Sequence, residues 1–296
     1  MNKRKWYQMF GMLLVVLLVA AGCGSSSDKD TNSGQESSQE SSQGAGQGTQ
    51  EKKVLKIAFN PGPYRDMFEN GARPVLESMG YEIVIREFTE GIQPNVAVAR
   101  GELDANTHQH IMYMESINQR EKLNNVALIE QPTPPMGLYS KKIDSLDQLK
   151  KGAKVNVPNE PPNLLRALTV LQDAGLIKIK DNIDPLQTSL NDILENPLDL
   201  DFIMTDPAQG PRALDDVDLV AIQGNYAVAN NIKLSSALKL ENLKPPFVVV
   251  ITVDGDRVNE QFAKDLIAAY ESDTFVNYVN SNPDYEGYYK PDYFNK

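Results

Sequence analysis

The chain is poor in the residue types that build disulfides, metal centres and nucleophilic active sites. Its 296 residues include one cysteine, two histidines and one tryptophan. A single cysteine excludes a disulfide within the chain, and two histidines alone do not complete a zinc or copper ligand set. The G-x-S-x-G pattern of many hydrolases is also missing. We therefore expect no catalytic residues and no cofactor, and a protein that is not an enzyme.

Basic residues are in the minority, since 29 lysines and arginines stand against 40 aspartates and glutamates, for a formal net charge of −11. Proteins that bind nucleic acid need a basic surface to meet the phosphates. The acidic balance therefore argues against nucleic acid as a partner.

The N-terminal region has a short apolar run but no long one. Residues 12–21 are apolar, and the run is shorter than the about 20 residues that cross a bilayer. Basic residues 3–5 precede it, and small residues lead from it to Cys23. This order predicts a secretory signal peptide over residues 1–22. It also resembles a bacterial lipobox in which Cys23 is acylated, with Ala20 where leucine is usual; a plain signal peptide before an unmodified cysteine is the alternative.

Apolar residues larger than alanine are missing from residues 24–51, which consist mainly of serine, glutamine and glycine. Such a segment cannot bury enough surface to offset the entropy lost on ordering. We expect residues 23–53 to be the acylated cysteine and a flexible tether on the outer face of a cell membrane. The low complexity of this tether points to a Gram-positive surface.

From residue 54 onward, short apolar strands alternate with amphipathic helices, which is typical of α/β proteins. We expect the main strands at residues 54–59, 82–88, 103–106, 126–129, 154–158, 200–204 and 219–223, and a further buried strand at the end of residues 244–253. We expect the main helices at residues 95–100, 111–122, 163–175 and 259–279.

Two proline-containing segments, residues 131–142 and 244–253, interrupt this alternation and predict crossings between two lobes. Lobe 1 would comprise residues 54–137 and 246–296, and lobe 2 residues 138–245. Each lobe is expected to be a mixed sheet flanked by helices.

The stretch VPNEPPNLLRAL, residues 157–168, has the features of an anion site at a helix start. Two prolines precede Asn163, which we interpret as the helix N-cap, so that Arg166 falls in the first turn. A cation in the first turn is unfavourable, because it lies at the positive end of the helix dipole. Its presence is explained if an anion binds the backbone N–H groups and the guanidinium together. Arg166 and Asn163 are therefore candidates for binding a carboxylate. The alternative is that Arg166 pairs with Glu160 or faces solvent.

Both histidines lie in GELDANTHQHIMYM, residues 101–114. If residues 107–112 were extended, His108, His110 and Met112 would share one face, as in a soft-metal site. A helix that begins after His110 would separate them, and the sequence has no other histidine to complete the set. We therefore expect no metal site, and we expect these side chains to pack or to line a pocket.

The chain resembles the methionine-binding lipoproteins of the NlpA/MetQ type in four segments: GELDANTHQHIMYM, MGLYSKKIDSLDQL, VPNEPPNLLRALTVLQDAGLIKIK and PAQGPRALDDVD. The similarity runs in order and with matching spacing from about residue 54 to residue 279. It implies a two-lobed periplasmic-binding-protein fold of type II and no catalysis. It also implies the solute-binding component of an ABC importer, with a methionine-like ligand, a permease and an ATPase as partners.

The resemblance assigns roles to single residues. Arg166 and Asn163 match positions that hold the ligand's α-carboxylate. His110 and Tyr113 match positions that wall the side-chain pocket. The resemblance therefore implies that the histidine-rich segment is a pocket wall.

Other positions depart from the family pattern. Gly91 stands where the family usually has tyrosine, and His108 where it has phenylalanine. Gln223 and Val249 each replace an asparagine that helps to hold the ligand's polar end, a contact that Asn225 or a bound water could restore. We therefore expect methionine or a related amino acid, with a short peptide, another amino acid or a methionine derivative as alternatives. A metal-binding or adhesin lipoprotein is a further alternative.

Overall fold

The computed structural model describes residues 53–89 and 91–296. The expected signal peptide, Cys23 and nearly all of the tether lie outside the described residues. The first strand begins at Lys53, one residue before the expected start of the fold. Within the described ranges, no helix has the length and apolar character needed to cross a membrane.

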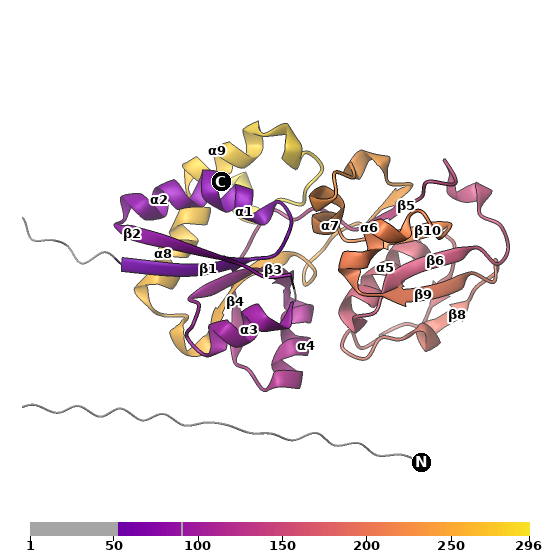
Figure 1. The fold of residues 1–296 in the computed structure, drawn as a ribbon, viewed down its shortest axis with the longest axis horizontal. Helices are drawn as coiled ribbons and strands as arrows, with labels where there is room; N and C mark the ends of the chain where they lie inside the picture. Colours follow the sequence, from indigo (N-terminus) through magenta and orange to yellow (C-terminus); the bar gives the residue numbers. More distant parts are fainter. Residues whose placement is uncertain (1–52, 90) are drawn as a thin grey trace, which may run out of the picture. The chain divides into compact units, whose positions relative to one another are not determined.

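The first sheet has five strands in the order β2-β1-β3-β12-β4 (Figure 1). Its strands are β1 Lys53–Phe59, β2 Tyr81–Glu87, β3 Ala105–His110, β4 Asn125–Glu130 and β12 Val249–Asp254. Strand β1 is parallel to β2 and β3, whereas β12 is antiparallel to β3 and β4. The sheet is therefore mixed, and a strand from late in the sequence lies between β3 and β4.

Helices flank this sheet on both faces (Figure 1). They are α1 Tyr64–Met67, a π-helical turn Phe68–Ala72, α2 Arg73–Ser78, α3 Ile92–Ala99, α4 Ile111–Glu121, α8 Gln261–Tyr270 and α9 Asp273–Ser281. Leu55, Ile57 and Phe59 of β1 belong to the large core that α1, α2, α8 and α9 cover. Ala58 lies on the opposite face, because side chains alternate along a strand, and it packs with Val98 of α3.

The second sheet also has five strands, in the order β11-β5-β10-β6-β9. Its strands are β5 Gly137–Tyr139, β6 Lys154–Pro158, β9 Asp201–Thr205, β10 Leu219–Ile222 and β11 Lys239–Leu240, and a separate pair is formed by β7 Lys178–Ile179 and β8 Ile193–Glu195. Its main helices are α5 Pro161–Asp173, α6 Gly210–Ala213 and α7 Gly224–Ala229. Helix α5 buries Leu164, Leu168 and Leu171 on one face against this sheet, as helical spacing requires.

The chain passes from the first sheet to the second between β4 and β5 and returns between β11 and β12 (Figure 1). Both crossings contain prolines, as expected. The expected lobe boundaries separate the two sheets except at β5, which begins at Gly137 and not at residue 138. The described residues nevertheless belong to one compact unit, so the division into two separate domains stays a prediction.

Around the first sheet, two elements differ clearly from the sequence-based expectation. The single helix expected over residues 259–279 is two helices, because Ser272 ends the run by capping α9 and its Oγ accepts a hydrogen bond from the Phe275 N–H at 3.2 Å. The strand expected at residues 103–106 lies further along, at Ala105–His110. This second difference matters because it places both histidines on β3.

Candidate functional site

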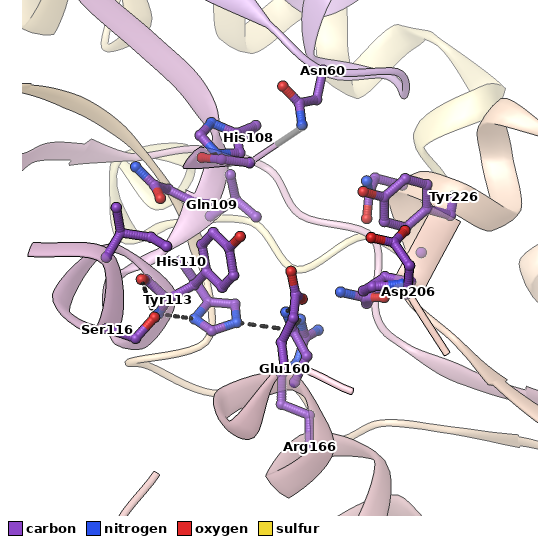
Figure 2. A pocket seen from close by; sticks show the side chains of 18 of the residues that line it. Asn60, His108, Gln109, His110, Tyr113, Ser116, Glu160, Arg166, Asp206 and Tyr226 are labelled. Carbon is purple, nitrogen blue, oxygen red and sulfur yellow. Dashed lines mark hydrogen bonds between the residues drawn. The ribbon is translucent and has the colours of Figure 1, made fainter. Parts of the chain in front are cut away.

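A cavity of about 440 Å³ is lined by residues that follow the carboxyl ends of strands in both sheets (Figure 2). Asn60 follows β1, and His110 ends β3. In the second sheet Glu160 follows β6, Asp206 follows β9 and Gln223 follows β10. Ligands of open α/β sheets bind at this edge, and the volume suits a small solute.

All nine residues assigned to the ligand site from the sequence line this one cavity. They are Gly91, His108, His110, Tyr113, Asn163, Arg166, Gln223, Asn225 and Val249. Residues up to 158 positions apart in sequence thus meet at one place. That each of them contacts a ligand stays a prediction.

His110 connects the two sheets. It is the N-cap of α4, and its Nδ1 accepts the Tyr113 N–H at 3.2 Å. The proton is therefore on Nε2, which donates to Asn163 Oδ1 at 3.0 Å (Figure 2). Burial and the nearby charge of Arg166 lower the pKa of His110 to about 3. With both nitrogens bonded, neutral His110 offers a ligand only its ring, as a pocket wall does.

Both ring nitrogens of His108 lie near oxygen atoms, and the neutral ring has one N–H to donate to one of them. Its Nδ1 lies 3.1 Å from Asn106 Oδ1, and its Nε2 lies 3.1 Å from the Gly91 carbonyl oxygen. Burial lowers the pKa of His108 to about 4. The extended face that would have joined both histidines to Met112 does not form, because α4 begins at Ile111. Among the described residues, no cluster of three or more His, Cys, Asp or Glu side chains could hold a metal ion.

The position of Tyr113 leaves little space for a side chain at Gly91. A Cβ added at Gly91 would lie 2.4 Å from the Tyr113 Oη, which is far inside van der Waals contact. The Tyr113 ring therefore occupies the place beside Gly91 that a larger residue would need. This contact gives a physical reason for the glycine at a position where the family usually has tyrosine.

The start of α5 corrects the prediction for Asn163 and Arg166. The helix begins at Pro161, with Glu160 as N-cap. Proline suits the first helical position, because its fixed φ matches the helix and its missing N–H would have had no partner there. Asn163 is therefore the third helical residue and not the N-cap, and Arg166 lies in the second turn.

Arg166 is buried and forms a bidentate ion pair with Glu241. The alternative pair with Glu160 does not form. Its Nε donates to Oε1 at 2.8 Å and its Nη2 to Oε2 at 2.7 Å, and the two side chains are 4% and 9% exposed. Its Nη1 has a longer contact of 3.4 Å to Asn163 Oδ1. Glu160 instead accepts a hydrogen bond from Asn163 Nδ2 at 2.7 Å.

The environment of the Arg166–Glu241 pair favours the ionised form of both groups. Burial acts to raise the pKa of Glu241, but the charge and hydrogen bonds of Arg166 outweigh it and the pKa is lowered. Burial acts to lower the pKa of Arg166, and Glu241 outweighs it in turn. Glu241 also accepts the Met136 N–H at 2.9 Å, so it is fixed from two sides.

Polar groups in the cavity that sequence reasoning missed include Asn60, Asp206, Tyr226 and, beside it, Glu241. Asn60 and Asp206 follow directly on predicted strands, so the rule for the carboxyl ends of strands could have found them. The ion pair of Glu241 with Arg166 joins residues 75 positions apart, and no sequence pattern indicates it. Val249, by contrast, presents an apolar side chain beside the cavity and pairs with His110 across the sheet.

The sequence matches the family model described as NlpA lipoprotein over residues 55–293. The chain belongs to the NlpA lipoprotein family. It is 35% identical over 221 residues to the probable D-methionine-binding lipoprotein MetQ of Haemophilus influenzae, with 74% of this chain and 81% of that protein covered. It is 33% identical over 229 residues to the D-methionine-binding lipoprotein MetQ of Escherichia coli, with 76% and 84% covered.

A solved structure shares the architecture of this NlpA-family chain. It is a nutrient binding protein from Burkholderia cenocepacia bound to methionine, with a TM-score of 0.75 and 34% sequence identity, and the match covers 80% of this chain and 99% of that one. The family resemblance and the fold class of a periplasmic substrate-binding protein, with two mixed sheets flanked by helices, are thereby confirmed. The named relatives are binding proteins.

Proposed function

We propose that this protein is the solute-binding component of an ABC importer and that it holds methionine or a related amino acid in the cavity between its two sheets. The family match and the methionine bound to a structural neighbour support this role. The observation that carries it is the cavity itself, where a buried arginine lies among the nine residues assigned from the sequence.

In this proposal the ligand's carboxylate binds Arg166 through Nη1, the nitrogen that Glu241 leaves free. A charge-assisted hydrogen bond of this kind contributes about 1.5–3 kcal/mol. Glu241 fixes the plane of the guanidinium, so little side-chain freedom is lost when the ligand binds. Asn163 has at most one free N–H to add, because Glu160 takes the other.

The ligand's side chain would lie against the rings of His110 and Tyr113, which pack edge-on with centroids 6.4 Å apart. Uptake and release require the two sides of the cavity to separate. Opening would break the His110–Asn163 hydrogen bond and the close packing of Gly62 on Asn225, where an added Cβ would lie 3.0 Å from the Asn225 Cβ.

The proposal includes a lipid anchor at Cys23 on the outer face of the membrane, where a permease and an ATPase receive the solute. The family description of NlpA lipoprotein supports this location. A Gram-positive surface stays a prediction from the tether alone.

A thermal-shift assay on the full-length protein in detergent tests the proposed function. The panel is L- and D-methionine, other amino acids and dipeptides. A ligand at 100 times its Kd stabilises the protein by about 2.7 kcal/mol, which raises Tm by roughly 5–11 °C for a domain of this size. No shift with any member of the panel would contradict the proposal, as would a shift that persists in Arg166→Met.

A further inference from the structure

Tyr64 also lines the cavity, although no sequence pattern indicates it. It follows the loop of residues 60–63 after β1 and is the first residue of α1. This is the carboxyl end of a strand, where open α/β sheets bind their ligands. The ring belongs to the core of the first sheet, and the residue is only 1% exposed. Packing therefore fixes the position of this side chain.

The hydroxyl of Tyr64 is available to a ligand. It makes no hydrogen bond to any of the described residues. Tyr139, Tyr270 and Tyr288 also have hydroxyls without a partner, but these are sealed inside the protein. The Tyr64 hydroxyl is not sealed, so the small exposed part of this residue includes its oxygen. Because Tyr64 lines the cavity, a solute in the cavity can reach this oxygen.

Arg166 is the charged group that acts on Tyr64. Burial raises the pKa of Tyr64 and Tyr288 raises it further, whereas Arg166 lowers it and Tyr226 raises it again. The net effect is a raised pKa, so the hydroxyl keeps its proton at neutral pH and can donate it. The positive charge of Arg166 disfavours an ammonium group beside this hydroxyl and favours a carboxylate.

We propose that Tyr64 binds the ligand, and that its hydroxyl donates a hydrogen bond to the same carboxylate that binds Arg166 Nη1. The inference rests on the proposed function and adds a residue to that site. A carboxylate has two oxygens with about four acceptor positions, so it can accept from both groups. Tyr64 belongs to the first sheet and Arg166 to α5 beside the second. The carboxylate would therefore join the two sides of the cavity.

The packing of Tyr64 makes this hydrogen bond effective. The ring is already fixed, so little side-chain freedom is lost when the ligand binds. A hydrogen bond to a charged acceptor is also stronger than one between neutral groups. Removal of the hydroxyl should therefore raise the Kd of the ligand about tenfold, which is about 1.4 kcal/mol.

Tyr64→Phe tests the inference, because it keeps the ring and removes only the hydroxyl. The probe is L-methionine labelled with carbon-13 at the carboxylate, or the amino acid of the thermal-shift panel that binds most tightly, labelled in the same way. Calorimetric titration of the full-length protein in detergent should give a Kd about tenfold higher in the variant. The carbon-13 NMR signal of the bound carboxylate should also shift, because one of its hydrogen bonds is lost.

Tyr270→Phe is the matched control. It removes a hydroxyl that is sealed without a partner in the core of the first sheet, so the Kd and the carboxylate signal should match those of the wild type. Urea unfolding without ligand should show no lower midpoint in either variant, because neither hydroxyl has a hydrogen bond to lose.

Three results would overturn the inference while the proposed function stands. They are a wild-type Kd in Tyr64→Phe, a raised Kd with an unchanged carboxylate signal, and a marked fall in the urea midpoint of Tyr64→Phe. The last would mean that the hydroxyl is needed within the protein itself. If no amino acid of the panel binds the wild-type protein, the proposed function itself fails.

Discussion

Replacing Glu241 with glutamine should strongly destabilise the ligand-free protein. Glutamine keeps the shape of the side chain and can still accept a hydrogen bond, but it leaves the Arg166 cation buried without a counter-charge. Breaking a buried pair from one side costs about 3–5 kcal/mol, and the two side chains here are only 4% and 9% exposed. The expected fall in Tm is roughly 6–20 °C for a domain of this size.

Urea unfolding of the full-length protein measures this loss without adding salt. Asp215→Asn is the control, because its pair with Lys141 is 56% and 70% exposed and should contribute less than about 1 kcal/mol. Replacing both Arg166 and Glu241 with leucine should cost less than Glu241→Gln alone, since no unpaired charge is left. A loss below about 1 kcal/mol in Glu241→Gln would refute the reasoning, because the buried cation would then need no counter-charge.

The same substitution should also change ligand binding. Glu241→Gln removes the negative charge that now cancels the charge of Arg166, so a ligand carboxylate at Nη1 gains the full attraction of the guanidinium. We expect a larger ligand-induced stabilisation in this variant than in the wild type, measured by the difference in urea midpoint with and without ligand. A smaller ligand effect would show that the carboxylate does not bind at Arg166.

Three further predictions concern the cavity wall and its titrating groups. Gly91→Ala places a Cβ 2.4 Å from the Tyr113 Oη. We expect this to lower the free energy of unfolding in urea by about 1–3 kcal/mol, and adding Tyr113→Phe should recover part of the loss. No recovery in the double variant would contradict the contact. Burial lowers the pKa of His108 to about 4 and of His110 to about 3. As the pH drops below 6.5, both histidines take up a proton in the unfolded chain but not in the folded protein, so the free energy of unfolding falls. The loss should be about 2 kcal/mol per histidine between pH 7.5 and 5, and His108→Phe should halve it; an unchanged pH profile in that variant would exclude His108 as a source. Burial raises the pKa of Glu160, so its ionised form destabilises the folded protein at neutral pH. Glu160→Gln should therefore raise the urea midpoint of the ligand-free protein at pH 7, and the gain should vanish in acid. A lower midpoint at pH 7 would contradict this cost of ionising Glu160.

Motifs that are local in sequence predicted much of the site. The segment around His110 and the segment around Arg166 each carry several pocket residues at fixed spacing, and their resemblance to the family assigned them to one pocket. Local propensity was less reliable at the α5 start. Asn163 is a good N-cap by type, but Pro161 suits the first helical position better, and the helix starts three residues earlier than an Asn163 cap would place it.

Contacts between distant segments could not be predicted from the sequence. Arg166 requires a counter-charge once it is buried, yet sequence alone offered Glu160, three positions before the Asn163 that was taken as the cap. The second sheet places Glu241 against Arg166 because β11 pairs with β5 beside α5. Glu160, the alternative partner for Arg166, instead accepts a hydrogen bond from Asn163 Nδ2 and lines the cavity.

A crystal structure of the full-length protein with its tightest-binding amino acid tests the central claim most directly. The account predicts the amino acid in the cavity between the two sheets, with its carboxylate within hydrogen-bond distance of Arg166 Nη1 and its side chain against the rings of His110 and Tyr113. An amino acid bound elsewhere, with the cavity filled only by water and Arg166 untouched, would contradict it.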